Sequence, residues 1–244
     1  MLPTLRTARL TLSPFTPDDA ALVQRYAGDA RIAATTAFVP HPYPDGVAEA
    51  WIATHLPQFL EKSNVTLAIR ARESGALRGA INLKLTPSPA TAPAPAAAPV
   101  PAHAPAPAVA IGAGESGCNP HSAISVPHLP APTAAASAAI GEIGYWVAVP
   151  FWNQGICTEA VRRIVRYGFD ELPRALDRTL AEIRAHHFVE NPASGRVMEK
   201  AGMRRAGVIP RALSKNGRLI DLVRYTMPRP HDPENPGPAG LNPT

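Results

Sequence analysis

The pattern of apolar and polar positions predicts strands and helices in alternation along the first part of the chain. Alternating leucines in 8–15 indicate a half-buried strand. A threonine, a proline and two aspartates at 16–19 are typical of a capped helix start. A loop rich in proline and aromatic residues follows, and 47–60 then repeats its apolar residues at helical spacing, with an expected kink at Pro57. Two further apolar runs on either side of 73–75 predict a hairpin.

The second half of the chain continues the same alternation. We expect a strand at 140–149, a helix from Thr158 to Leu172, a strand at 179–188, a short helix that Asn191 caps, and a closing hairpin around Asn216-Gly217. Helices and strands in this order predict an α/β domain with a mixed sheet.

Composition divides the chain into an ordered domain and two biased segments. The segment 87–139 contains 12 of the 29 prolines and a single charged residue, Glu115. Because such a segment has no periodic apolar face to offset its ordering entropy, we expect a disordered Ala/Pro-rich insert there. We expect the Pro-rich tail 228–244 to be disordered as well. The ranges 1–86 and 140–227 then form a single domain.

Charge and cysteine usage restrict the classes of function. The net charge of +5 and the pI near 9.6 suit an anionic partner. The chain has no Lys/Arg run with interleaved aromatic residues, so its sequence gives little support for nucleic-acid binding. Cys118 and Cys157 are far apart, one of them in the insert, and predict neither a disulfide framework nor a metal site. No apolar run approaches the ~18 residues of a membrane span, and no signal peptide is evident, so we expect a cytoplasmic protein.

Four stretches carry the most specific signal: "RLTLSPFTPDDA", "GEIGYWVAVPFWNQGICTEAVR", "HHFVENPASGRVMEKAGM" and "NGRLIDLVRYTM". In this order and spacing they resemble the GNAT superfamily of acyl-CoA-dependent N-acetyltransferases, and more narrowly its ribosomal-protein N-acetyltransferase (RimJ/RimL-like) branch. The resemblance covers essentially the whole chain outside the insert and the tail. It implies the GNAT fold, with a mixed, mostly antiparallel central sheet, flanking helices and splayed central strands. It also implies acetyl-CoA as co-substrate.

The stretch 152–157, Trp-Asn-Gln-Gly-Ile-Cys, falls on the superfamily's acyl-CoA loop, whose pattern is Gln/Arg-x-x-Gly-x-Gly/Ala. A diphosphate needs several converging N–H donors, and a glycine turn at a helix N-terminus supplies them with the favourable end of the helix dipole. Trp152 and Cys157 depart from the pattern, but such a contact is mostly backbone. The resemblance therefore implies cofactor binding by Asn153, Gln154, Gly155, Ile156, Cys157 and Thr158. The alternative is an ordinary strand-to-helix turn.

The resemblance assigns further cofactor contacts to the strand before this loop. Trp146, Val147 and Ala148 lie where the family's strand splays from its neighbour and binds the pantetheine arm with its open ladder. Asn191 is expected both to cap its helix and to meet the pantetheine amide. An ordinary paired strand and a purely structural cap are the alternatives.

Two residues are candidates for the chemistry. A carboxylate on the strand beside the thioester, Glu142, is the candidate general base, and Ser194 is the candidate acid for the departing thiolate. The alternative for Glu142 is a carboxylate in a salt bridge or facing solvent. The alternative for Ser194 is a first-turn helix residue that bonds local backbone. Many superfamily members carry a tyrosine acid near the position of Met198, which shifts the acid role here to Ser194. His186 and His187 alternate on a strand, so they are badly placed to chelate a metal.

These features lead to three hypotheses on function. The first is acetyl transfer to a primary amine by direct attack in a ternary complex. A protein N-terminal α-amine is favoured, because deprotonating it at pH 7 costs about 1.4 kcal/mol, against about 4.6 kcal/mol for a lysine amine. The second is acetylation of a small-molecule amine such as an antibiotic or polyamine, which an acidic acceptor pocket would indicate. The third is a non-catalytic acyl-CoA-binding module.

Overall fold

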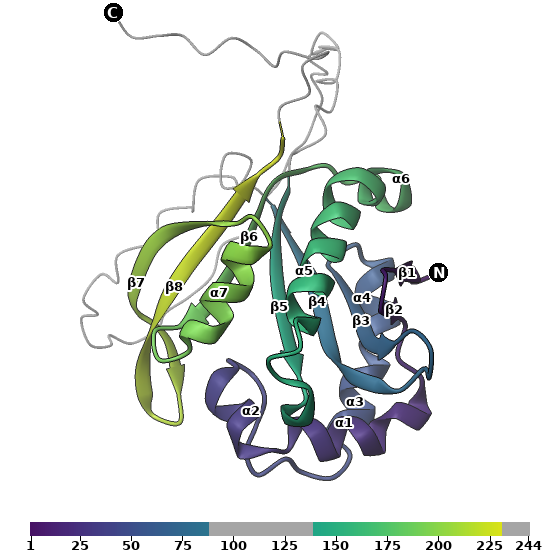
Figure 1. Ribbon diagram of the computed structural model, residues 1–244, viewed down its shortest axis with the longest axis vertical. Coiled ribbons are helices and arrows are strands. Elements are labelled where there is room, and N and C mark those ends of the chain that lie inside the picture. Colours follow the sequence, from purple (N-terminus) through teal and green to yellow (C-terminus); the bar gives the residue numbers. More distant parts are fainter. Residues whose placement is uncertain (88–138, 231–244) are drawn as a thin grey trace, which may run out of the picture. The chain divides into compact units, whose positions relative to one another are not determined.

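A single eight-stranded sheet forms the centre of the computed structural model, which describes residues 1–87 and 139–230 of the 244-residue chain (Figure 1). The strand order is β1-β2-β3-β4-β5-β6-β8-β7. Only β5 and β6 run parallel among these described neighbours, and the others are antiparallel. The strands are β1 (Leu5–Arg6), β2 (Leu10–Ser13), β3 (Asn64–Ala71), β4 (Leu77–Pro87), β5 (Ala139–Val147), β6 (Leu180–Phe188), β7 (Arg204–Lys215) and β8 (Arg218–Pro228).

Helices cover both faces of this sheet. In Figure 1, α5 and α7 lie together on one face, and the N-terminal helices lie toward the other face and the lower edge. The larger apolar core lies between the sheet and α5, and a smaller one joins α1 and α3 to β3 and β4. The α-helices are α1 (Ala20–Ala27), α2 (Ala30–Thr35), α3 (Val47–Ala53), α4 (His55–Leu60), α5 (Ile156–Arg166), α6 (Leu172–Leu176) and α7 (Pro192–Lys200). Short 3-10 turns at Pro17–Asp19 and Val149–Phe151 and a π-helical turn at Tyr167–Glu171 complete them.

The predicted α/β class is confirmed, and several local signals act as expected. Thr16 and Asp19 form a reciprocal capping box at the start of the first helical segment. Asn191 caps α7, where its side chain accepts a hydrogen bond from the Ser194 N–H. Asn216 and Gly217 both have positive φ at the turn between β7 and β8.

The helical region before β3 differs from the prediction in two places. A helix, α2, occupies part of the expected loop, and Asp29 caps it by accepting from the Arg31 N–H at 2.9 Å. The break in 47–60 falls at Thr54 and not at Pro57, because Thr54 ends α3 and its Oγ1 donates to the Trp51 carbonyl at 2.7 Å. Pro57 lies in the first turn of α4, where its missing N–H breaks no helical hydrogen bond.

The expected helix from Thr158 to Leu172 is also interrupted. The α-helix begins earlier, at Ile156, and ends at Arg166. A π-helical turn follows, and a new short helix begins at Leu172. Pro173 has no N–H to continue the ladder at this point, which accounts for a break that the apolar spacing alone did not predict.

The ends of the predicted insert and tail lie inside the sheet. Pro87 is the Cα partner of Ala139 in the β4–β5 ladder, and Pro228 ends β8. The ordered ranges therefore extend at least one residue beyond 86 and 227, and one residue before 140. The rest of the insert, with Glu115 and Cys118, and the tail beyond 230 lie outside the described residues.

The two central strands diverge in the middle of the sheet. β5 and β6 pair from Ala139↔Leu180 to Ile143↔Ala185, and beyond Ile143 the ladder between them stops. β6 continues to pair with β8 as far as Phe188, and β5 with β4 as far as Val147. This is the splay that the resemblance implies, and it opens the sheet beside the start of α5.

Candidate active site

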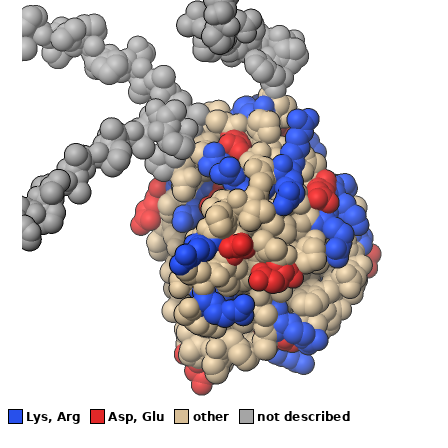
Figure 2. Space-filling model, turned by 90° about the vertical axis from the view of Figure 1, so that its left-hand side faces the viewer, with Lys and Arg blue, Asp and Glu red and all other residues tan. Residues whose placement is uncertain are grey.

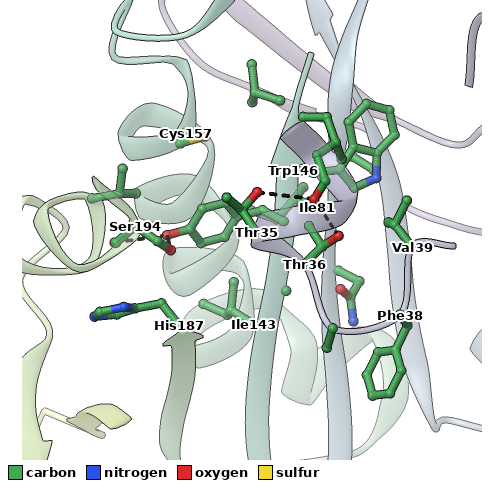
Figure 3. Close-up of a pocket in the computed structure, with 18 of the residues that line it drawn as sticks. Thr35, Thr36, Phe38, Val39, Ile81, Ile143, Trp146, Cys157, His187 and Ser194 are labelled. Atoms are coloured by element: carbon green, nitrogen blue, oxygen red, sulfur yellow. Dashed lines mark hydrogen bonds between the residues drawn. The ribbon is translucent and has the colours of Figure 1, made fainter. Parts of the chain in front are cut away.

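A cavity of about 1070 Å³ lies at the point where β5 and β6 diverge. One side of it is formed by β5, the 153–158 loop and the start of α7 (Figure 3). The other side is formed by α2, the segment after it, α3, β4 and the β7–β8 hairpin. The sequence-predicted residues at this cavity are Glu142, Trp146, Val147, Asn153, Gln154, Gly155, Ile156, Cys157, Thr158, Asn191 and Ser194. Ala148 is the one predicted residue that does not line it, and it is fully buried.

Gly155 gives the loop before α5 its shape. Its φ of +75° lies in the left-handed region, which favours glycine, and it is the N-cap of α5. The first backbone hydrogen bond of the helix runs from the Glu159 N–H to the Gly155 carbonyl, at 3.1 Å. The N–H groups at 156–158 therefore have no partner within α5 and are free to bind an anion at the cavity.

An arginine from the N-terminal strand region holds this loop in place. Arg9 Nε donates to Glu159 Oε2 at 2.7 Å, and its Nη1 donates to the Gln154 carbonyl at 3.1 Å. Thr7 Oγ1 donates to the other oxygen of Glu159 at 2.6 Å. Partial burial acts to raise the pKa of Glu159, but the hydrogen bonds from Thr7 and Arg9 outweigh it and keep that pKa below its usual value. Arg9 Nη2 lies 3.4 Å from where a Cβ on Gly155 would be.

An open basic groove of about 650 Å³ adjoins the loop and shares Gly155, Thr158 and Lys200 with the larger cavity. Glu159 is the one carboxylate among the described residues that line it. Six cationic side chains line the same groove: Arg6, Arg9, Arg162, Arg163, Arg166 and Lys200. A groove of this charge suits the phosphates of a nucleotide.

The backbone of β5 presents alternate residues to the gap. The Ala148 N–H donates to the Arg78 carbonyl on the β4 side, and the Ala139 N–H donates to the Thr179 carbonyl on the β6 side. Because backbone groups alternate along a regular strand, even-numbered residues of β5 face β4 and odd-numbered residues face β6. The backbone groups of Tyr145 and Val147 therefore face the gap. Those of Trp146 and Ala148 do not, which corrects the predicted backbone contacts of these two residues.

The side chain of Trp152 hydrogen-bonds one of these gap-facing backbone groups. Its Nε1–H donates to the Val147 carbonyl at 2.6 Å, and the residue remains 39% exposed. The gap-facing backbone groups of β5 that remain without such a bond are therefore the N–H and carbonyl of Tyr145 and the N–H of Val147.

Glu142 and His186 form a pair on the face that carries α1 to α4. His186 Nδ1 lies 3.3 Å from Glu142 Oε1, and the Glu142 side chain is 48% exposed. The hydrogen bond from His186 is the main reason that the pKa of Glu142 lies below its usual value. Glu142 is therefore ionised at neutral pH, which suits attraction of a cationic amine. The adjacent His187 faces α7 instead, where its Nε2 lies 2.8 Å from where a Cβ on Gly195 would be.

Ser194 lies on the opposite face, beside the gap, where it meets a tyrosine from β5 (Figure 3). The hydroxyl of Tyr145 is 2.8 Å from Ser194 Oγ and donates to the Ser194 carbonyl at 3.2 Å. Burial is the main cause that raises the pKa of Tyr145 above its usual value, so its hydroxyl keeps its proton at neutral pH. The pair therefore offers a neutral hydrogen-bond donor to an anion that forms in the gap.

Cys157 is not an activated nucleophile. Burial raises the pKa of its thiol to about 12, so the thiol is protonated at neutral pH. No group of three or more His, Cys, Asp or Glu side chains in the described ranges is placed to hold a metal ion. Within the same ranges, no helix is both long and apolar enough to cross a membrane.

The chain matches the family model described as "Acetyltransferase (GNAT) domain" over residues 9–96 and 113–204, which is more than half of its length. It belongs to the GNAT acetyltransferase family. The family expected from the sequence is thereby confirmed.

Relatives and solved structures of this family agree with the fold. YdaF of Bacillus subtilis (strain 168), provisionally named a ribosomal N-acetyltransferase, is 36% identical over 86 residues, which are 35% of this chain and 44% of YdaF. The chain spans about half the length of the curated relatives it matches. The structure of RimL, a ribosomal L7/L12 alpha-N-protein acetyltransferase, in complex with coenzyme A superposes with a TM-score of 0.61 at 11% identity. The superposition covers 93% of this chain and 98% of RimL.

Another similar structure is a spermidine N-acetyltransferase from Vibrio cholerae in complex with CoA and spermine. Its TM-score is 0.58 at 14% identity, and the superposition covers 91% of this chain and 97% of the spermidine enzyme. At these identities, this structure and that of RimL show the fold alone.

Several residues that line or support the two cavities could not be found from the sequence. Tyr145 was part of a recognised motif but had no role, because its contact with Ser194 joins positions 49 residues apart. Arg9 reaches the loop across 145 residues. The wall of the cavity opposite the 153–158 loop includes Thr35, Thr36 and Phe38 from the segment expected to be loop, and no local pattern marks them.

Proposed function

We propose that the protein is an acetyl-CoA-dependent N-acetyltransferase whose acceptor is a primary amine, most favourably the α-amine of a protein or peptide. The observation that carries the proposal is the divergence of β5 from β6 directly beside the glycine turn of α5. It provides an unpaired strand for an extended arm and a helix N-terminus for a diphosphate within one cavity. Family membership supports the same reaction class.

In this proposal the cofactor lies on the α5 and α7 face. The diphosphate meets the N–H groups of 156–158, and the pantetheine arm pairs with the gap-facing backbone of Tyr145 and Val147. The basic groove that contains Arg6 and Arg9 receives the phosphate-bearing adenosine end. The thioester then lies near Ile143, where the β5–β6 ladder stops.

The acceptor amine approaches from the opposite face, where Glu142 lies. The nitrogen lone pair forms a bond to the thioester carbon, the carbon–sulfur bond breaks, and the electron pair leaves with sulfur. Glu142, supported by His186, takes the proton that the nitrogen loses. Ser194 donates its proton to the departing thiolate, and Tyr145 holds the Ser194 hydroxyl in place. Because the Cys157 thiol is protonated, direct attack without an acetyl-enzyme is the simpler path.

The charge of the acceptor side favours an α-amine over a polyamine. Glu142 is the one carboxylate among the described residues that line the main cavity, and the cationic Lys84, its Cα partner on β4, lines the cavity beside it. A polycation would need several carboxylates to replace its hydration. The name of the relative YdaF, a provisional ribosomal N-acetyltransferase, supports a protein acceptor, whereas the structural neighbours include both a ribosomal-protein enzyme, RimL, and a spermidine enzyme.

The face that carries the β7–β8 hairpin fits a protein partner better than nucleic acid. In Figure 2, Lys and Arg side chains on this face are interspersed with Asp and Glu. Protein surfaces that bind nucleic acid are dominated by positive charge. We therefore infer a peptide-like acceptor and no nucleic-acid partner.

Mass spectrometry after incubation with acetyl-CoA tests the proposal. The panel contains peptides with a free α-amine, the same peptides with a blocked α-amine and one lysine, and spermidine. We expect acetylation of the free α-amine at the highest rate. Faster acetylation of spermidine would favour the small-molecule alternative. CoA binding with no acetylated product from any amine would favour the acyl-CoA-binding module instead.

A further inference from the structure

We propose that Asn82 is an acceptor-binding residue, whose side-chain carbonyl takes one N–H of the incoming primary amine while Glu142 takes the other. The proposal rests on the proposed function. To the primary-amine acceptor proposed above it adds discrimination against N-alkylated amines, and a residue that no sequence motif marks. The observation behind it is a chain of three amide side chains on the floor of the cavity.

The amide chain runs across α4, β3 and β4 toward Glu142. Asn64 Nδ2 donates to Gln58 Oε1 at 3.0 Å, and Asn82 Nδ2 donates to Asn64 Oδ1 at 3.1 Å. With the oxygen and nitrogen atoms assigned from this network, the end of the chain is the carbonyl oxygen of Asn82. No donor within the described residues bonds this oxygen, and Asn82 lines the cavity.

Gly144 allows the Asn82 carbonyl to lie where it does. Asn82 and Gly144 are Cα partners in the β4–β5 ladder, and a Cβ on Gly144 would be 2.6 Å from Asn82 Oδ1. The carbonyl therefore lies directly over the first residue of β5 after the divergence from β6. Glu142 is two positions earlier on the same strand, so it shares this face of the sheet.

Two fixed acceptors beside the reacting centre match the hydrogens of a primary amine. A neutral primary amine carries two N–H groups when its lone pair points at the thioester carbon. One is lost as a proton to Glu142, and the other remains in the amide product and needs an acceptor during attack. Asn82 Oδ1 supplies it. A secondary amine has a single N–H, so it leaves Asn82 Oδ1 unpaired in a partly desolvated site.

The test compares two peptides that differ by one methyl group, an N-terminal alanine peptide and its N-methylalanine form. For the wild-type protein we expect a lower kcat/KM for the methylated peptide. In Asn82→Ala, kcat/KM for the alanine peptide should fall by roughly 10–100-fold, whereas that for the methylated peptide should fall by less than about threefold. The selectivity ratio therefore collapses, which a loss of stability or of cavity shape alone would not produce.

Variants of Asn64 test the direction of the amide chain. Asn64→Asp keeps an acceptor for Asn82 Nδ2 and should retain most of the wild-type selectivity. Asn64→Leu removes that acceptor, frees the Asn82 amide to rotate, and should resemble Asn82→Ala. Thr86→Val, on the same strand but outside the cavity lining, controls for loss of a polar group in β4, with folding followed by melting temperature.

Equal losses for both peptides in Asn82→Ala would overturn the proposal, as would a wild-type ratio in that variant. Either result is distinguishable from failure of the proposed function, because wild-type turnover of the alanine peptide is measured in the same experiment. If the wild-type protein binds CoA but acetylates neither peptide, the proposed function fails and the Asn82 assignment fails with it.

Discussion

The cofactor side and the acceptor side of the cavity are built in different ways. On the proposed cofactor side, the groups available to a ligand are mostly backbone N–H groups, and one glycine with φ of +75° orients them. On the proposed acceptor side, the cavity is lined by side chains from α2, α3, β4, β5 and the β7–β8 hairpin. A backbone site depends on local conformation, and a side-chain site depends on the packing of distant elements.

The two sides should differ in how well they tolerate substitutions. Backbone donors remain when most side chains around them are replaced, which is consistent with cofactor binding despite the departures of Trp152 and Cys157 from the superfamily pattern. We therefore expect exchanges on the acceptor side to change the specificity of this chain while leaving its cofactor binding largely intact.

Replacing the base should separate the two sides most clearly. In Glu142→Gln we expect kcat to fall by roughly 10²–10⁴-fold, while the Kd for acetyl-CoA hardly changes, because the carboxylate lies on the acceptor face. The hydrogen bond from His186 keeps the pKa of Glu142 below its usual value, so wild-type activity should follow deprotonation of the α-amine, with pKa near 8. The deficit of the variant should shrink as the pH rises through that range. Wild-type turnover of the variant at pH 7 would remove Glu142 from the chemistry.

A valine at the glycine turn should damage the cofactor side alone. In Gly155→Val the left-handed φ becomes strained, and the new side chain points toward Arg9 Nη2. We expect the Kd for CoA to rise more than tenfold, by about 1.4 kcal/mol or more, as measured by calorimetry. Gly46→Val is the matched control, because Gly46 caps α3 with φ of +80° and has no atom within 4 Å of where its Cβ would be. Its strain should lower the melting temperature and leave CoA affinity unchanged. Unchanged affinity in folded Gly155→Val would contradict the assigned diphosphate site.

Removing the arginine that holds the loop should have a smaller effect on the same side. Arg9→Met loses the bonds to Glu159 and Gln154 and one positive charge of the basic groove. We expect roughly a 3–10-fold weaker CoA affinity, with a loss that decreases at high salt because part of it is electrostatic. Arg174→Met removes an equal charge from α6, away from both cavities, and should leave CoA affinity unchanged. Equal affinities for both variants would show that Arg9 does not support the loop.

A lysine on the β7–β8 hairpin gives the corresponding test on the acceptor side. Lys215 Nζ donates to the carbonyls of Ala33, Thr36 and Val39, and so joins the hairpin to the wall of the cavity; burial lowers its pKa. We expect Lys215→Met to raise the acceptor KM by about threefold to tenfold through loss of these bonds, with CoA affinity unchanged. Arg218→Met, on the same hairpin, is the control. An unchanged acceptor KM in the folded Lys215 variant would mean that this wall does not contact the acceptor.

The insert should matter least to either side. Pro87 and Ala139 are partners at the end of the β4–β5 ladder, so a short Gly/Ser bridge in place of 88–138 closes a hairpin between strands that are already paired. Because closure entropy grows only logarithmically with loop length, we expect little change in melting temperature or turnover. Lost activity in a protein with an unchanged melting temperature would show that the insert takes part in acceptor binding.

The same contrast explains which features the sequence predicted. The turn at Gly155, the capping box at 16–19 and the hairpin at Asn216-Gly217 depend on neighbours a few residues away, and all three lie where expected. The Tyr145–Ser194 pair and the amide chain that ends at Asn82 depend on the register between strands and on the position of α7. No local pattern carries that information, so these contacts could be found only in the folded chain.

Two errors came from helix interiors and one from strand geometry. The helix break at Thr54 depends on a side-chain bond to the Trp51 carbonyl, which propensity does not predict. The π-helical turn after Arg166 interrupts an apolar pattern that continues through it. Trp146 and Ala148 were expected to offer backbone groups to the cofactor. The side to which each residue's N–H points follows from the ladder with β4, and the family pattern does not carry that information.

The most direct test is one peptide that carries both a free α-amine and one lysine, incubated with acetyl-CoA and wild-type protein or Glu142→Gln. Fragmentation mass spectrometry locates the acetyl group, and calorimetry measures CoA binding by both proteins. We predict acetylation of the α-amine by the wild-type protein, little product from Glu142→Gln, and the same CoA affinity for both. Acetylation of the lysine alone, or equal α-amine acetylation by the two proteins, would contradict the assignment of the acceptor side.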